Sequence, residues 1–227
     1  MISARIDKKT LKFLARLKRN NNREWFNAHK AEYQQARDNF AEFLDALIEA
    51  TARFDASVDW LVAEDCMFRI HRDLRFSRDK TPYKSGFGAH LVANGRKVDK
   101  GLAGYYIHVE PGATRIACGS YQPPRAWLNA IRAEIAVNGK ALTAIVEKPV
   151  FKAYFDELRG DMLKTVPRGY AKDHPNAEWL KRKGFLAYHG FDDDQLLASD
   201  FVHEAAAGYR LAFPLIEFLN AALPDMP

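Results

Sequence analysis

The residues best suited to chemistry are concentrated between positions 69 and 84. Six cationic and two acidic side chains give this segment a net charge of +4, whereas the whole chain carries only +5. The eight residues are Arg69, Arg72, Asp73, Arg75, Arg78, Asp79, Lys80 and Lys84. Such a concentrated positive potential attracts anionic partners and speeds their association. The segment therefore indicates a site for an anionic ligand.

The residue types in this segment favour a phosphate-bearing ligand. The planar guanidinium of arginine forms two parallel hydrogen bonds to a phosphate or carboxylate group. On an extended strand, alternate side chains project to the same face about 7 Å apart, so Asp73 would lie between two arginines and orient one of them. Two lysines and a tyrosine follow, and they could close the site. The predicted ligand-binding residues are Arg69, Arg72, Asp73, Arg75, Lys80, Tyr83 and Lys84.

The pattern leaves open whether a reaction follows binding. An enzyme acting on a phosphorylated small molecule would need a positioned acid or base, and His71 and Tyr83 are the nearest candidates. A metal could in principle be held by His71 and Asp73 together with His108 and Glu110, since both pairs have strand spacing. Nearby arginines would each repel a dication by roughly 5 kcal/mol at an effective dielectric of about 20, so we predict no metal site.

Arg72 interrupts the alternation of apolar and polar residues between Phe68 and Phe76. It falls on the side that carries the apolar residues, where a charged group needs a partner. We therefore expect its guanidinium to be largely buried and bonded to a carboxylate or to backbone carbonyls.

Two other kinds of function compete with a small-molecule site. Nucleic acid could bind the basic segment, with Phe76, Tyr83, Phe87, Tyr105 and Tyr106 as stacking faces. Against this, Phe76 and Tyr105 occupy positions expected to face the core, and tracking of phosphodiesters favours a longer stripe without acids. In the third interpretation, the arginines pair with carboxylates of their own chain in a structural or interaction protein without a ligand.

Composition restricts the class of protein. The content of apolar residues is 48% and that of charged residues 28%, as in soluble globular proteins. No apolar run approaches the roughly 20 residues of a membrane span, and the first twenty residues lack the apolar core of a signal peptide. With only two cysteines, we expect a cytoplasmic protein without disulfides. Neither glycine-rich phosphate-binding motif occurs, and we predict no cofactor.

Periodicity predicts helices in the first third of the chain. Leu11, Leu14 and Leu17 recur at helical spacing, and Asn21 with Glu24 has the form of a capping box, which predicts a second helix from about Arg23. Its apolar positions continue to about residue 53. A second capping box formed by residues 39 and 42 predicts a break near residue 38.

The period changes in the middle third, and the last third is mostly helical again. Strands are expected over 68–76, 86–92, 104–110 and 114–120, the last two joined by a turn at Pro111-Gly112-Ala113, with essentially all of the sheet between residues 67 and 120. Residues 160–191 are expected to be irregular with one short helix. These elements predict a single α+β domain over residues 1–227, with N-terminal helices, a central, mainly antiparallel sheet and C-terminal helices packed on it.

Several separated motifs carry a resemblance to a known family. The run from Arg69 to Lys84 resembles R-x-x-R-D-x-R-F-x-x-D-K-x-P-Y-K, the signature of the uncharacterised family known as domain of unknown function 2461 (DUF2461). Further matching pieces are the segments 21–26, 104–106, 164–170 and 173–175. The resemblance spans nearly the whole chain and implies no activity or ligand, but it does imply that these segments belong to one domain and meet in space.

Overall fold

The computed structural model describes residues 4–75, 77–93, 95 and 102–223. Along the chain the elements are α1 (Lys8–Arg19), α2 (Arg23–Ala28), α3 (Lys30–Ala52), the short 3-10 helix η1 (Ala56–Val58), α4 (Ala63–Cys66), β1 (Phe87–Leu91), β2 (Gly104–Val109), β3 (Thr114–Ser120), α5 (Arg125–Val146), α6 (Pro149–Phe155), α7 (Ala177–Leu180), β4 (Phe185–Phe191), α8 (Asp193–Leu197) and α9 (Phe201–Ala221). The four strands form one sheet in the order β1-β2-β3-β4. The predicted α+β class, with helices before and after a central antiparallel sheet, is confirmed.

The chain forms two compact units. Unit 1 comprises Met1–Leu91, Tyr106–Ile116 and Gly190–Ala207, and unit 2 comprises Val92–Tyr105, Ala117–His189 and Gly208–Pro227. The division passes through β2, β3, β4 and α9, so four elements contribute residues to both units. The single domain expected from the sequence stays a prediction.

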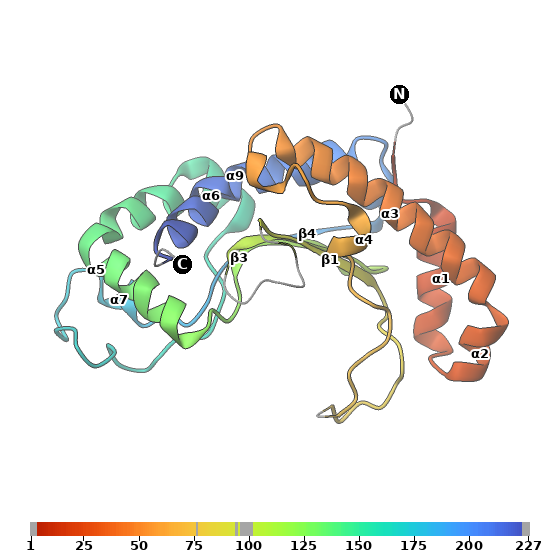
Figure 1. Cartoon of the computed structure of the whole chain (residues 1–227), viewed down its shortest axis with the longest axis horizontal. Helices are drawn as coiled ribbons and strands as arrows, with labels where there is room; N and C mark the ends of the chain where they lie inside the picture. Colours follow the sequence, from red (N-terminus) through yellow and green to blue (C-terminus); the bar gives the residue numbers. More distant parts are fainter. Residues whose placement is uncertain (1–3, 76, 94, 96–101, 224–227) are drawn as a thin grey trace. The chain divides into compact units, whose positions relative to one another are not determined.

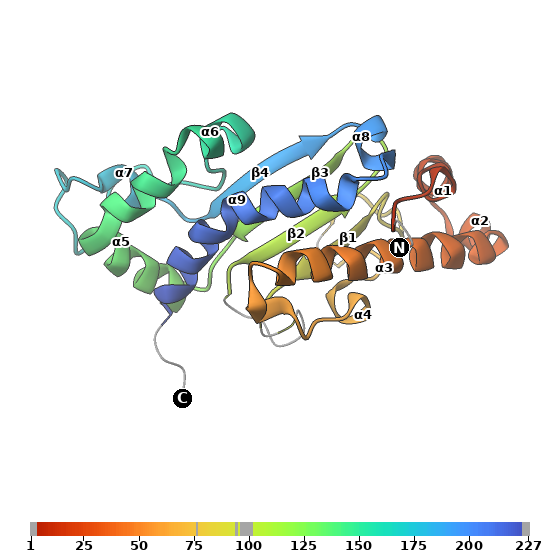
Figure 2. The same cartoon turned by 90° about the horizontal axis from the view of Figure 1, so that it is seen from above.

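The core of unit 1 lies between α3 and one face of β1. Helices α3 and α4 lie on the same side of this strand (Figures 1 and 2). Phe87 of β1 stacks on Phe40 of α3 with ring centroids 5.3 Å apart, and Ala89 and Leu91 on the same face are fully buried. Burial of these apolar side chains stabilises the layer and leaves the other face of the strand to the alternate residues.

The helices of unit 1 differ from the sequence prediction at two places. Asn22, rather than Asn21, caps α2 by accepting a hydrogen bond from the backbone of Trp25, at 2.9 Å. The break predicted near residue 38 is wrong, because the helix begun at Arg23 ends at Ala28, before His29, and α3 is then continuous from Lys30 to Ala52. Asn39 does not cap a helix there; its side chain bonds to the backbone N–H of Asp7 (2.9 Å), the hydroxyl of Thr10 (2.7 Å) and the carbonyl of Arg5 (2.8 Å), which fixes the start of the chain against α3.

The strand predictions are confirmed at three of four places. β1, β2 and β3 agree with the predicted 86–92, 104–110 and 114–120, and the turn between β2 and β3 has Gly112 at φ 70°, which favours glycine. The prediction that residues 67–120 hold essentially all of the sheet is wrong, because β4 lies at Phe185–Phe191, within the stretch expected to be irregular. β4 has only a short alternation: Phe185, Ala187 and Phe191 are buried, but His189, at the same parity, is only half-buried.

The strand expected over 68–76 is reduced to isolated bridges. Met67 pairs with Ala89 and His71 pairs with Tyr83, both antiparallel, but no ladder forms between them. Beyond the second bridge, the Asp73 carboxylate accepts a hydrogen bond from the backbone of Arg75 at 3.1 Å, and Asp79 does the same for Thr81 at 2.9 Å. Such local side-chain bonds to the backbone compete with strand pairing, so the chain turns. Phe76 lies outside the described residues.

The helical part of unit 2 is organised by a buried arginine. Arg132 of α5 donates to the backbone carbonyls of Leu180 and Arg182, at 3.0 and 3.1 Å. Helix α5 is distorted at Asn138, whose backbone is not helical, and α6 and α7 pack against α5. Arg132 therefore binds the irregular chain around α7 to the long helix α5.

Candidate functional site

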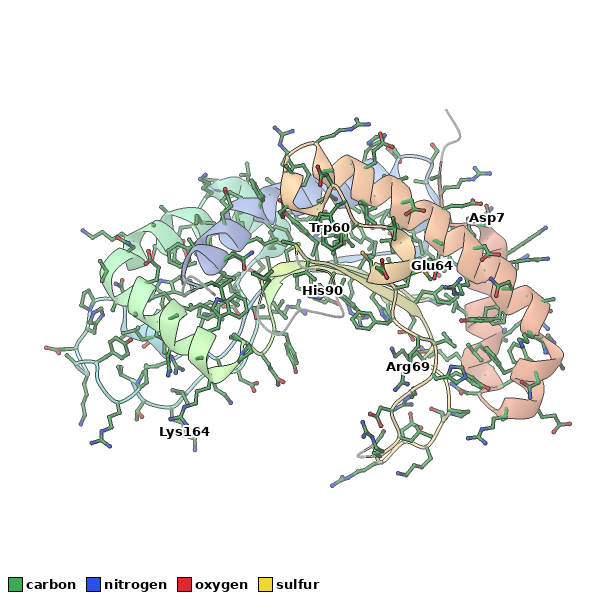
Figure 3. The ribbon with its side chains drawn as sticks, in the orientation of Figure 1. Asp7, Trp60, Glu64, Arg69, His90 and Lys164 are labelled. Atoms are coloured by element: carbon green, nitrogen blue, oxygen red, sulfur yellow. The ribbon has the colours of Figure 1, made fainter. Side chains whose placement is uncertain are left out.

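A pocket of about 550 Å³ lies within unit 1, on the face of the sheet that α3 does not cover. This face of the pocket carries Gly88 of β1, Tyr106 and His108 of β2 and Arg115 of β3, with Gly86 directly before β1 and Glu110 directly after β2. All six are on the parity opposite to the buried apolar residues. Figure 3 shows His90, two residues beyond Gly88, and Arg69 on this side of β1, with Trp60 on the α3 side. Alternation along the strands thus builds one apolar core face and one polar pocket face.

The other wall of the pocket comes from the end of α1 and from the chain around the two isolated bridges, residues 67–75 and 77–85, which we call the bridged segment. Asn21 forms a pair of hydrogen bonds with the backbone of Tyr83, 3.0 Å from Tyr83 N to Asn21 Oδ1 and 2.9 Å from Asn21 Nδ2 to Tyr83 O. The Tyr83 ring is only 4% exposed and stacks on Phe26 with centroids 4.0 Å apart. These contacts fix the segment that carries Arg72 and Lys84 next to α1 and α2.

Arg72 has the carboxylate partner that its sequence position predicted. Its guanidinium donates to the carboxylate of Asp79, to Thr81 Oγ1 at 2.6 Å and to Ser77 Oγ at 3.2 Å. Its side chain is 27% exposed, so it is half-buried at the pocket wall rather than enclosed in the core. Hydrogen bonds from Thr81 and Arg72 lower the pKa of Asp79 to about 2, so the Arg72–Asp79 pair stays charged except in strong acid.

The predicted ligand-binding residues separate into two groups. Arg72, Tyr83 and Lys84 line the pocket, whereas the remaining four, Arg69, Asp73, Arg75 and Lys80, are not among its lining residues. The Asp73 carboxylate accepts from Arg75 Nε at 3.0 Å and from Nη2 at 2.6 Å, and hydrogen bonds from Arg75 hold the pKa of Asp73 well below its usual range. This pair is exposed.

The two lysines of the segment bond to backbone carbonyls. Lys80 donates to Leu74 O at 3.0 Å, and Lys84 donates to Arg69 O at 2.9 Å while lying 5.2 Å from the centre of the Phe68 ring. Lys84 lines the pocket, and Lys80 does not.

The two acid–base candidates, His71 and Tyr83, are both in the bridged segment. They pair through their backbones, and their ring centroids lie 5.2 Å apart. Tyr83 reaches the pocket, but its stacking on Phe26 makes it a packing residue of the wall. His71 is exposed and is not among the residues that line the pocket.

A row of polar side chains forms the floor of the pocket: Tyr106 and His108 of β2, and Glu110 directly after its end. These three were not among the ligand-binding residues predicted from the sequence. Tyr106 Oη lies 3.1 Å from His108 Nδ1, and His108 Nε2 lies 2.9 Å from Glu110 Oε2. The other oxygen of Glu110 accepts from Ser85 Oγ at 2.7 Å and from Lys18 Nζ at 3.0 Å. The strand spacing of His108 and Glu110 was visible in the sequence, and Tyr106 continues the same period of two. The sequence gives no sign that Ser85 and Lys18 meet this row.

Burial and hydrogen bonding set the charges in this row. Burial would raise the pKa of Glu110, but hydrogen bonds from His108, Ser85 and Lys18 outweigh it and lower that pKa to about 2. Burial also lowers the pKa of His108, against the opposing hydrogen bond from Glu110, and raises the pKa of Tyr106. At neutral pH the row therefore holds a neutral tyrosine, a neutral histidine and an ionised carboxylate.

Within the part of the chain that the structure describes, no group of three or more histidine, cysteine, aspartate or glutamate side chains is arranged to hold a metal ion. Both cysteines are buried thiols that form no disulfide, and burial raises the pKa of the Cys118 thiol far above its usual range. Among those same residues, no helix combines the length and the apolar content needed to cross a membrane.

Comparison with known proteins gives one match. The family model described as "Conserved hypothetical protein (DUF2461)" matches residues 9–218. No curated protein and no solved structure matches the chain. Of the segments that carry the resemblance, 21–26 and 69–84 lie in unit 1 with Tyr106, whereas 164–175 lies in unit 2.

Proposed function

Because the chain belongs to the DUF2461 family of conserved hypothetical proteins, we infer its function from the pocket, and we propose that it binds a small phosphate-bearing molecule there. The excess of positive charge in the pocket lining carries this proposal. Four cationic side chains, those of Lys18, Arg72, Lys84 and Arg115, line the pocket together with two carboxylates. Two carboxylates balance only two of these four positive charges, so the lining keeps a net positive charge. Each carboxylate is bonded to one cation, Asp79 to Arg72 and Glu110 to Lys18.

Arg115 is the strongest candidate for a direct contact with the ligand. It projects from β3 on the pocket face and donates from Nη1 to the carbonyl of Ala113 at 2.9 Å. Among the described residues, no carboxylate forms an ion pair with it. The backbone contact orients its guanidinium without neutralising it, and a phosphate group would supply the missing negative charge.

The size of the pocket supports a small ligand. Sites for small molecules usually enclose roughly 300–1,000 Å³, and this pocket of about 550 Å³ is in that range. An extended nucleic acid would instead favour a groove with many exposed cations and stacking faces. Tyr83 and Tyr105, two of the aromatic residues considered for stacking, are buried in packing contacts.

The test compares binding of inorganic phosphate to the wild type, to Arg115→Gln and to the double variant Arg69→Ala/Arg75→Ala. Phosphate stabilises proteins generally by exclusion from their surface, so each melting temperature is compared with that in chloride at equal ionic strength. We expect a phosphate-specific increase in the wild type and in the double variant, and its loss in Arg115→Gln.

Each other outcome of this comparison has a defined meaning. If the double variant loses the phosphate-specific increase in melting temperature and Arg115→Gln keeps it, phosphate binds to the exposed segment rather than in the pocket. Equal shifts in all three proteins would contradict an anion site. Binding of an oligonucleotide whose affinity falls steeply with salt would instead support the nucleic-acid alternative.

A further inference from the structure

The polar row on β2 has the order of bonds found in a catalytic triad. Tyr106, His108 and Glu110 occupy alternate positions, so their side chains follow one another along one face of the strand. The distances of 3.1 Å and 2.9 Å connect a hydroxyl to one imidazole nitrogen and a carboxylate to the other. A nucleophile bonded to a base that a third group orients is the general signature of covalent catalysis.

The direction of each hydrogen bond follows from the ionised state of Glu110. A carboxylate only accepts, so His108 must donate its Nε2–H to Glu110. A neutral imidazole carries one proton, which leaves Nδ1 as an acceptor for the hydroxyl of Tyr106. The row thus points the basic nitrogen of His108 at the tyrosine proton, and the carboxylate would stabilise the imidazolium that forms when this proton moves.

Gly88 of β1 and Gly86, directly before this strand, leave the space that the polar row occupies. A Cβ at Gly88 would lie 2.8 Å from Tyr106 Oη, and a Cβ at Gly86 would lie 3.0 Å from His108 Nε2. A residue with a side chain at either position would occupy the space that the Tyr106 hydroxyl and the His108 ring now fill. Gly88 also lines the pocket, so the pocket reaches the tyrosine hydroxyl.

We propose that Tyr106, His108 and Glu110 form a catalytic triad in which Tyr106 attacks the phosphorus of a small phosphomonoester. This inference rests on the proposed function, since Arg115 and Lys84 would hold the phosphate group that Tyr106 attacks. The side chains of His108 and Glu110 are only 12% and 13% exposed, so solvent has little access to the base and to the carboxylate that orients it. The activity assigned is hydrolysis or transfer of a phosphoryl group through a phosphotyrosine.

The reaction balances with water as the second substrate. Tyr106 Oη forms a bond to phosphorus as its proton moves to His108 Nδ1, and the bond from phosphorus to the leaving oxygen breaks. His108 then gives its proton to the leaving oxygen, which departs as an alcohol. In the second half, water loses a proton to His108 and attacks phosphorus, and Tyr106 leaves and takes this proton back, so that phosphate is the product.

The first experiment measures the reactivity of the Tyr106 oxygen with para-fluorosulfonyl benzoate, an anionic reagent that transfers its sulfonyl group to activated tyrosines and releases fluoride. Mass spectrometry of the digested protein gives the labelling rate at each tyrosine. Tyr121, which is 65% exposed and lies in unit 2, is the internal reference. We expect Tyr106 to react at least tenfold faster than Tyr121 although it is half-buried.

Three variants separate activation from mere packing. His108→Gln should lower the rate at Tyr106 by about 100-fold or more, the usual contribution of a general base. Glu110→Gln should lower it as well, because a neutral amide does not stabilise an imidazolium. Arg115→Gln should lower capture of the anionic reagent while leaving the row of bonds intact, and inorganic phosphate should protect Tyr106 in the wild type.

The second experiment uses para-nitrophenyl phosphate, whose leaving group needs no protonation. The wild type and the control variant Tyr121→Phe should release nitrophenolate and carry phosphate on Tyr106 after an acid quench, and Tyr106→Phe should do neither. If phosphate binds in an Arg115-dependent way while Tyr106 is neither labelled faster than Tyr121 nor phosphorylated, the triad is refuted and the binding function stands. If Tyr106 is selectively labelled and phosphate does not bind, the phosphomonoester substrate is refuted together with the proposed function.

Discussion

The side-chain amide of Asn21 holds the backbone of Tyr83 as a neighbouring strand would, accepting from its N–H at 3.0 Å and donating to its C=O at 2.9 Å. These two bonds connect the chain between α1 and α2 to the segment that forms one wall of the pocket. The stability of this wall, the two glycines beside the polar row, the half-buried Arg72 and the protonation of His108 can each be tested.

Replacing Asn21 by alanine should detach the pocket wall. Two partly buried backbone groups of Tyr83 would lose their partners, which typically costs about 1–3 kcal/mol. Urea unfolding should show this loss, and labelling of Lys84 by an amine reagent should become faster. The matched control is Asn20→Ala, which removes one exposed bond to the carbonyl of Arg16 and should change stability by less than about 1 kcal/mol. Equal effects of the two variants would contradict the role of Asn21.

Gly86→Ala should mainly lower the stability of the protein, whereas Gly88→Ala should mainly displace the Tyr106 side chain. A Cβ at position 86 would lie 2.6 Å from the backbone oxygen of Val109, which cannot move without disturbing β2, so we expect a loss of roughly 1–3 kcal/mol. A Cβ at position 88 meets the hydroxyl end of Tyr106, a side chain that can turn away at a cost of about one hydrogen bond, or about 1 kcal/mol.

Thermal unfolding of the two glycine variants, with the labelling rate of Tyr106, checks this difference. Gly88→Ala should keep most of the melting temperature and lose the enhanced reactivity of Tyr106. Gly86→Ala should lower the melting temperature by several degrees. A reversed order of stability would show that the β1–β2 register differs from the one described.

Arg72→Ala should destabilise the protein, whereas Arg78→Ala should have little effect. Arg72 donates to Asp79, Thr81 and Ser77, and its loss leaves these groups to solvent at a cost of about 1–2 kcal/mol. Its partial exposure makes this smaller than the cost of breaking an enclosed ion pair. Arg78 is exposed, so its truncation should stay within about 0.5 kcal/mol. Similar shifts in melting temperature for both variants would contradict the structural role of Arg72.

Stability should fall on mild acidification because of His108. Burial lowers the pKa of this histidine below its ordinary 6.5, so below that pH the unfolded chain binds a proton that the folded protein excludes. The contribution of His108 to the free energy of unfolding is fully present above about pH 6.5. It is lost as the pH falls through the lower pKa that this histidine has in the folded protein. Lys84 and Arg115 oppose the added charge, and Glu110 favours it.

Melting temperatures at about pH 7.5 and about pH 5.5 test this dependence, since the Glu110 carboxyl titrates lower, between its ordinary 4.5 and about 2. Between these two pH values, the melting temperature of His108→Gln should decrease less than that of the wild type. The melting temperature of His203→Gln, a variant at an exposed position of α9, should decrease as much as that of the wild type. A wild-type decrease that His108→Gln leaves unchanged would assign the effect to other groups.

Local patterns in the sequence determined much of the secondary structure. The helices at both ends, the three central strands and the turn at Gly112 follow from spacing and turn residues, which act over a few neighbours. β4 was missed because its alternation is short, and the strand over 68–76 was overpredicted because Asp73 and Asp79 bind their own neighbouring backbone.

The site divides in the same way between sequence and tertiary structure. The concentrated charge that includes Arg72 and Lys84, and the period-two spacing of His108 and Glu110, are local properties that the sequence alone determined. Tertiary structure decided that Arg115 and Tyr106 share a pocket with Arg72, that Ser85 and Lys18 meet Glu110, and that Gly86 and Gly88 lie beside the polar row. These relationships depend on the register between β1 and β2 and on contacts between residues that are tens of positions apart in the sequence. The period of one strand carries no information about which residues of another strand lie beside it.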